Sequence, residues 1–125
     1  MLTKVLLLAL GGTLGTLGRY GVSLLAVRVV GGTFPLGTLT VNLAGCFLIG
    51  LAFALAEDRA VLGPGGRIFF MTGFLGALTT FSTFALETVT AGQAGSLGLP
   101  AANLALNNVG GLLMVLLGIW VGRAA

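Results

Sequence analysis

The chain has 125 residues, of which 57% are apolar and only 7% are charged. A soluble domain carries about a quarter charged residues, so this composition indicates a small integral membrane protein in a lipid bilayer. It has no histidine, three acidic residues, one cysteine and a net charge of +3, a set that excludes acid–base, metal-hydrolytic and triad enzymes, internal disulfides and nucleic-acid binding.

The first apolar run extends from Leu2 to Val30, and we expect a transmembrane helix over residues 4–28. Lys4 ahead of an apolar stretch is also typical of a signal peptide, but this run continues past a typical signal core and shows no obvious cleavage pattern. Gly11 and Gly15 form a GxxxG motif, whose small residues let two helix backbones approach closely in lipid.

A turn over residues 31–35 leads to the second predicted span, residues 36–56, which is close to the roughly 20 residues a bilayer requires. Thr38, Asn42 and Cys46 follow at intervals of four and share one helix face. An amide in hydrocarbon needs hydrogen-bond partners, so Asn42 either joins two helices or lines a polar pathway. A charged, glycine-rich loop over residues 57–67 follows.

The third predicted span covers residues 68–90 and contains the stretch GFLGALTTFSTF from Gly73 to Phe84. Glycines and clustered hydroxyls are poor helix formers, so we expect the helix to break between Gly76 and Thr80. Non-helical backbone survives at membrane depth only inside protein or beside a polar cavity, and broken spans recur at ion sites. The carbonyls before the break favour a small cation, and the N–H groups after it, capped by Thr79 or Thr80, favour an anion. A simple glycine kink that improves packing is the alternative.

A loop without charges precedes the fourth predicted span, residues 101–121, on which Asn103, Asn107 and Gly111 form a polar stripe. Four spans place both termini on one side of the membrane. Lys4, Arg59, Arg67 and Arg123 lie on that side and Arg28 on the other, a modest bias towards cytoplasmic termini.

Two charged residues lie within the spans. Arg19 has no acid on its own helix, so its side chain must reach the interface, face a wet vestibule or pair with another span. Glu87 follows Phe84 by three residues and either pairs with Arg19 or lies at the mouth of a pathway.

The polar features of three spans together indicate an ion pathway. Amide and hydroxyl groups are donors, and there is no acidic ring of the kind that cation channels use. Phe81 and Phe84 lie on one helical face, and aromatic rings present positive edges that suit a small anion. The same two rings are equally compatible with ordinary packing or contact with lipid.

In this order and within four short spans, three segments resemble the Fluc/CrcB fluoride channels: GGTLGTLGRY (11–20), GTLTVNLAGCFLIG (37–50) and GFLGALTTFSTF (73–84). The resemblance implies an all-α membrane protein of four helices, the third broken, in a prokaryotic inner membrane. It further implies an antiparallel, dual-topology dimer with a central structural sodium ion, Na+. Fluoride would leave the cytoplasm passively through two fluoride pores at the subunit interface.

Matched motif by motif, the resemblance assigns roles to individual residues. Phe81 and Phe84 would turn their ring edges to fluoride, Asn42 would be the pore amide, and the backbone carbonyls of Gly76 and Thr79 would bind sodium. The remaining matches are pore hydroxyls and charges near the route: Ser82, Thr83, Thr38, Arg19 and Glu87.

The sequence departs from the family on the fourth helix, where Asn103 and Asn107 stand at positions that commonly carry a tyrosine and a hydroxyl. An amide still donates hydrogen bonds, so Asn107 stays on the predicted pore. The charge bias disfavours a chain that inserts in both orientations. A homologous second subunit of opposite bias is therefore the alternative to a homodimer.

Two other functions compete with a channel. A four-helix multidrug exporter needs a glutamate in its first span, where this chain has Arg19 and no acid. A non-conducting assembly subunit would tolerate apolar replacements of its polar residues.

Overall fold

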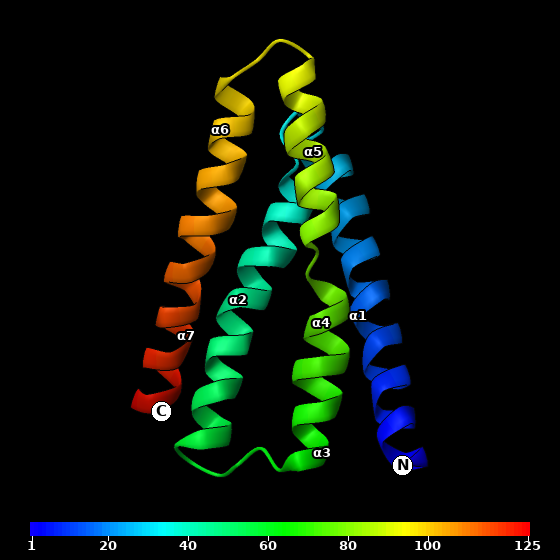
Figure 1. The fold of residues 1–125 in the computed structure, drawn as a ribbon, viewed down its shortest axis with the longest axis vertical. Helices are drawn as coiled ribbons and strands as arrows, with labels where there is room; N and C mark the ends of the chain where they lie inside the picture. The colour runs from blue at the N-terminus through cyan, green and yellow to red at the C-terminus, as the bar shows by residue number, and fades with distance from the viewer.

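The computed structural model describes all 125 residues, and every long element is helical. Four helical spans are long and apolar enough to cross a membrane, which confirms the predicted all-α class and the number of spans (Figure 1). The first two are α1 (Leu2–Val29) and α2 (Leu36–Glu57). The third comprises α3 (Pro64–Gly66), η1 (Arg67–Leu75), α4 (Gly76–Leu78) and α5 (Phe81–Gln93), and the fourth comprises α6 (Gly98–Ala105), η2 (Leu106–Gly110) and α7 (Gly111–Ala124).

Both termini and the loop between the second and third spans lie at one end of the molecule, as the four-span prediction requires (Figure 1). Two ion pairs stand at this end: Arg67 with Glu57, and Arg123 with Asp58 at 2.7 Å between Nε and Oδ2. The second pair joins the last turn of α7 to the residue that follows α2. The remaining loops, residues 30–35 and 94–97, lie at the opposite end.

The third span breaks where the sequence predicts it. Helix α4 ends at Leu78, and Thr79 and Thr80 adopt extended conformations (φ −83°, ψ 157° and φ −151°, ψ 119°) before α5 begins. The Thr80 hydroxyl accepts a hydrogen bond from the N–H of Thr83 at 3.2 Å, the usual way to satisfy a free N–H group of a first helical turn. The cap therefore fixes the start of α5 at the break.

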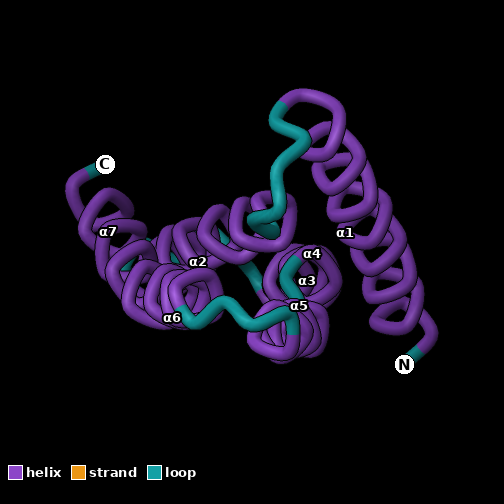
Figure 2. Tube along the Cα trace, turned by 90° about the horizontal axis from the view of Figure 1, so that it is seen from above, coloured by secondary structure: helices purple, strands orange, loops and turns teal.

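The break also gives the two halves of the third span different neighbours. Before it, η1 and α4 pack along α1, whereas α5 packs along α6. Figures 1 and 2 show α4 beside α1 in both views, with α5 continuing the span at an offset. Helices α2 and α7 form the other long contact. The break therefore lies where one helix pair gives way to another.

Glycines bring the helix backbones together at both long contacts. A side chain at Gly11 or Gly15 would collide with the main chain of the third span, at the carbonyls of Phe69 and Phe74. On α7, Gly118 meets the backbone of α2 in the same way. The contacts of Gly11 and Gly15 confirm that the GxxxG motif serves close helix packing.

Replacing Gly11 with alanine is therefore expected to destabilise the bundle, because the added methyl group has no flexible neighbour to displace. Gly12→Ala is the matched control, since a Cβ there meets open space. Thermal unfolding of the two purified variants in detergent should show a lower midpoint for Gly11→Ala alone. Equal midpoints would show that α1 is free to shift away from the third span.

Only 20 of the 125 residues are buried, so most of the apolar surface of a single chain faces outward. The largest buried cluster is small and lies next to the break, with Val41, Leu75 and Leu78 at its centre. The fold is consequently held more by backbone proximity and polar contacts than by a broad side-chain core.

Candidate ion pathway

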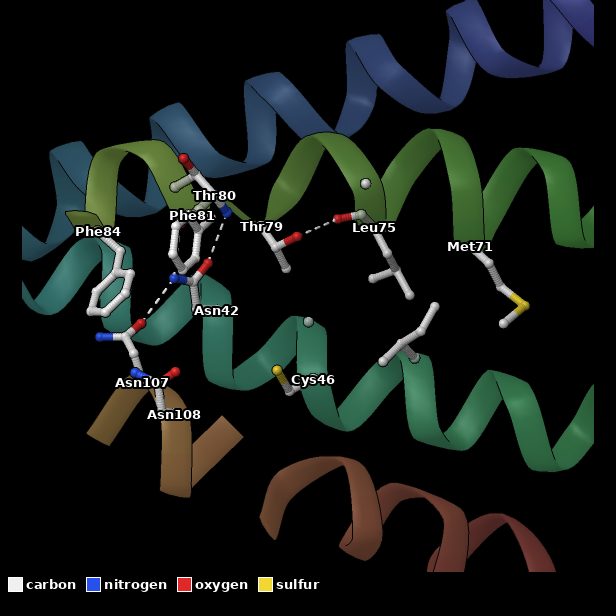
Figure 3. A pocket seen from close by; sticks show the side chains of 13 residues that line it. Asn42, Cys46, Met71, Leu75, Thr79, Thr80, Phe81, Phe84, Asn107 and Asn108 are labelled. Atoms are coloured by element: carbon white, nitrogen blue, oxygen red, sulfur yellow. Dashed lines mark hydrogen bonds between the residues drawn. The ribbon is translucent and has the colours of Figure 1, made fainter. Parts of the chain in front are cut away.

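A cavity of about 340 Å³ opens beside the break of the third span, between α2, η1, α4, α5 and η2 (Figure 3). Its apolar wall includes Ile49, Met71 and Leu75. Its remaining lining includes five residues singled out by the sequence: Asn42, Gly76, Phe81, Phe84 and Asn107. Residues from three spans thus converge on one cavity, as the polar pattern predicted.

Asn42 binds the broken backbone directly. The Thr80 N–H donates to Asn42 Oδ1 at 2.8 Å, and Asn42 Nδ2 donates to the Thr80 carbonyl at 3.1 Å. A reciprocal amide pair of this kind satisfies main-chain groups that hydrocarbon cannot. The second hydrogen on Asn42 Nδ2 goes to Asn107 Oδ1 at 2.9 Å. Asn42 therefore joins two helices and also lines the cavity, so its position fits both predicted roles.

The two phenylalanines meet edge to face at the same cavity. Their ring centroids are 5.5 Å apart and their planes are inclined by 64°. Phe84 is 4% exposed, whereas Phe81 is 75% exposed on the surface of the single chain. One ring is therefore fixed by its surroundings, and the other is left uncovered.

The carbonyls that precede the break lack their usual helical partners. The N–H of Thr80 donates to Asn42 instead of to the Gly76 carbonyl, and the N–H of Thr83 donates to the Thr80 hydroxyl instead of to the Thr79 carbonyl. Gly76 is exposed, and a Cβ there would meet no atom within 4 Å. Oxygens free of hydrogen bonds at a helix C-terminus suit a hard cation.

Thr38 and Glu87 lie apart from this cavity. The Thr38 hydroxyl donates to Glu87 Oε1 at 2.7 Å, and both residues line a second cavity of about 310 Å³ near the loop over residues 30–35. Glu87 therefore forms a hydrogen bond with Thr38 and makes no ion pair with Arg19. Its Oε2 atom is buried without a hydrogen-bond partner.

Three other predicted residues are not brought to the cavity beside the rings. Arg19 is half-buried, and its Nε atom has no hydrogen-bond partner within the chain. Ser82 is exposed, and its hydroxyl lies 3.5 Å from that of Thr80. The Thr83 hydroxyl accepts from the Thr80 hydroxyl at 3.0 Å. These two hydroxyls surround the N-terminal cap of α5.

Two contributions to the site were not predicted from the sequence. Thr80 caps the second half-helix as expected, but both of its main-chain groups also bond to Asn42. Thr88 accepts a hydrogen bond from Asn103 Nδ2 at 2.9 Å, although the two lie on different spans. The i, i+4 spacing from Phe84 to Thr88 places Thr88 on the face of the rings, and this was the available signal.

Known proteins are similar in sequence to this chain over nearly its whole length. Residues 6–119 match the profile of the CrcB-like protein family, described as Camphor Resistance (CrcB). The chain belongs to the CrcB family. A CrcB protein of Acidobacterium capsulatum, named Fluoride-specific ion channel FluC, is 44% identical over 120 residues, which cover 96% of each chain.

Other CrcB relatives give the same picture. A FluC of Opitutus terrae is 43% identical, with 96% of this chain and 89% of that protein covered. One of Nitratidesulfovibrio vulgaris is 42% identical, with 95% and 93% covered. CrcB proteins of this type are channels and not enzymes, which confirms the exclusion of catalysis drawn from composition.

Proposed function

We propose that this protein is a passive fluoride channel that lets cytoplasmic fluoride leave the cell. The observation that carries the proposal is the edge-to-face pair of Phe81 and Phe84 in one cavity with the amides of Asn42 and Asn107. None of the three acidic residues lines that cavity, so it is lined by amides and ring edges without a fixed negative charge. The names of the relatives support the same ion.

Fluoride is small and strongly hydrated, so a protein passes it by supplying donors in place of its water. Amide N–H groups and positive ring edges do this in a narrow space. Chloride is larger and gains less from such a lining. The apolar wall formed by Ile49, Met71 and Leu75 limits how much water accompanies the ion.

The second cavity is assigned to a pore mouth. Thr38 and Glu87 line it near the loop over residues 30–35, at the end opposite the termini. Arg19 would raise the local concentration of anions from a vestibule. We keep the hydroxyls of Ser82 and Thr83 as candidates for the route after the break, where they lie beside Thr80.

An antiparallel dimer completes the proposed channel, with two pores at its interface. A single chain leaves Phe81 75% exposed and Gly76 exposed, so one wall of the cavity is missing. An inverted second copy would cover both residues. We favour a homodimer in a prokaryotic inner membrane, and a homologous second subunit is the alternative that the four-to-one charge bias keeps open.

Sodium fits the same face of the molecule. The carbonyls of Gly76 and Thr79 are free of main-chain hydrogen bonds, and a Cβ at Gly76 would meet only open space. Two such oxygens from each of two subunits would hold one hard cation between them. A bound sodium ion would supply positive charge at the interface and would tie the two broken helices together.

Removal of sodium is expected to weaken the dimer, because the uncovered carbonyls of Gly76 and Thr79 would then face each other across the interface. The measurement is the monomer fraction in detergent after exchange into N-methylglucamine chloride, with sodium, lithium and potassium chloride compared. A monomer fraction that is the same in all four salts would exclude a structural sodium ion at these residues.

Liposomes that contain the purified protein test the proposed function. Fluoride efflux, followed with a fluoride electrode, is expected to exceed that of empty liposomes, and trapped chloride is expected to stay inside. Efflux no faster than from empty liposomes would refute the channel. Release of both anions at similar rates would refute the proposed selectivity and leave an unselective pore.

A further inference from the structure

A chain of hydrogen bonds begins at the break, and each residue in it donates to the next one. The main-chain N–H of Thr80 is only a donor, so the oxygen of the Asn42 amide must face it, at 2.8 Å. The nitrogen of that amide then faces the Thr80 carbonyl at 3.1 Å and Asn107 Oδ1 at 2.9 Å. Both hydrogens of Asn42 Nδ2 are thereby used, and Asn107 turns its oxygen to Asn42 (Figure 3).

The same direction continues into the bundle. Asn107 Nδ2 donates to the main-chain carbonyl of Asn103 at 3.0 Å and to Asn103 Oδ1 at 2.9 Å. Asn103 is 0% exposed, and its Nδ2 donates to Thr88 Oγ1 at 2.9 Å. The Thr88 hydroxyl donates in turn to the Phe84 carbonyl at 2.8 Å. A main-chain N–H at one end and a main-chain carbonyl at the other fix the orientation of every amide between them.

This orientation is unfavourable for an anion. An anion beside Asn42 needs N–H groups, but the Asn42 hydrogens are already bound and Asn107 presents a carbonyl oxygen there. Fluoride binding, on which this inference rests through the proposed function, therefore requires the Asn107 amide to turn over. Rotation of a terminal amide about its last torsion meets only a broad, low barrier.

We propose that Asn103 is a positioning residue whose buried amide turns over together with that of Asn107, and so converts the cavity from presenting an oxygen to presenting N–H donors. After the turn, Asn107 Nδ2 and the released hydrogen of Asn42 both face the anion. Asn107 Oδ1 accepts from Asn103 Nδ2, and Asn103 Oδ1 accepts from the Thr88 hydroxyl. Each buried amide keeps a partner in both states, as a buried polar network requires. The main-chain carbonyl of Asn103 gives up its bond from Asn107 Nδ2 and keeps the N–H of Leu106 as its donor. Its repulsion of the incoming Asn107 oxygen makes the oxygen-presenting state the resting one.

The substitution Asn103→Leu separates the two states. With leucine, the resting state survives, because Asn107 Nδ2 still has the main-chain carbonyl of residue 103 and the Thr88 hydroxyl still has that of Phe84. In the turned state the oxygen of Asn107 would have no donor. An unsatisfied buried acceptor disfavours that state about tenfold to a hundredfold, and fluoride flux should fall by the same factor.

Fluoride efflux from liposomes should therefore be compared for the wild type, Asn103→Leu and Thr13→Val. Thr13 is the matched control, since its exposed hydroxyl on α1 only donates to the Ala9 carbonyl of its own helix at 2.7 Å and lies outside the cavity. We expect a large loss of flux for Asn103→Leu alone, with its dimer fraction and thermal midpoint unchanged. Flux of Asn103→Leu within twofold of the wild type would overturn the proposal, whereas a wild type without flux would instead refute the channel itself.

A second measurement is needed if Asn103→Leu fails to fold. The chain has four asparagines, so solid-state NMR of wild-type protein with ¹⁵N-labelled asparagine gives few side-chain signals to assign. Saturating sodium fluoride, compared with sodium gluconate, should shift the Asn103 side-chain signal although this residue is buried. An unchanged Asn103 signal beside a shifted Asn42 signal would show that Asn103 is only structural.

Discussion

Replacement of Phe84 with isoleucine is expected to reduce fluoride efflux by about twofold to tenfold while the dimer stays intact. Isoleucine fills most of the buried volume but has no positive ring edge, and contacts of this kind contribute about 0.5–1.5 kcal/mol beyond burial. Phe81→Ile should have a similar effect, because its ring meets that of Phe84 at 5.5 Å between centroids. Efflux from liposomes at matched protein content is the measurement.

The control for these variants is Phe53→Ile, which changes an exposed ring on α2 outside the cavity. It should conduct like the wild type. If Phe81→Ile and Phe84→Ile also conduct like the wild type, the two rings serve packing only. In that case the donors of the pathway would have to be the amides and hydroxyls alone.

Replacement of Asn42 with leucine is expected to have the second large effect, on both stability and flux. The side chain is of similar size, but the N–H and the carbonyl of Thr80 lose their partner at membrane depth. Each unsatisfied group costs about 1–3 kcal/mol, so the break itself should be destabilised. Unfolding in detergent would show the loss of stability, and fluoride efflux the loss of donors.

Thr13→Val again serves as control, since it removes a hydroxyl from α1 that bonds only within its own helix and lies outside the cavity. A stable but non-conducting Asn42→Leu protein would separate the two roles and assign Asn42 to the ion alone. Full conduction by Asn42→Leu would contradict its place on the pathway, whatever happened to stability.

The sequence predicted the elements of the fold well, because hydropathy, glycine spacing and turn residues act locally. The break at Gly76–Thr80 is an example, since weak helix formers and a capping hydroxyl occur together there. The predicted GxxxG motif also matched backbone contacts, at Gly11 and Gly15. The helices extend up to four residues beyond the predicted apolar spans, because polar and glycine residues at their ends are helical too.

The partners of single polar side chains could not be predicted in the same way. The pairing of Glu87 with Thr38, and not with Arg19, depends on the rotation of three helices about their axes. The π-helical turn η2, which carries Asn107, is a further case, because no residue pattern in LNNVG announces it. Asn103 was seen as part of a polar stripe, but its burial and its bond to Thr88 follow only from the packing of α6 on α5.

The glycine contacts of α1 have a consequence for how the width of the ion path is maintained. Because Gly11 and Gly15 rest on main-chain atoms of the third span, the distance between α1 and that span is set by backbone groups and not by side chains of the third span. In the proposed channel, a passage that has to distinguish fluoride from the larger chloride would take part of its dimensions from this contact between backbones.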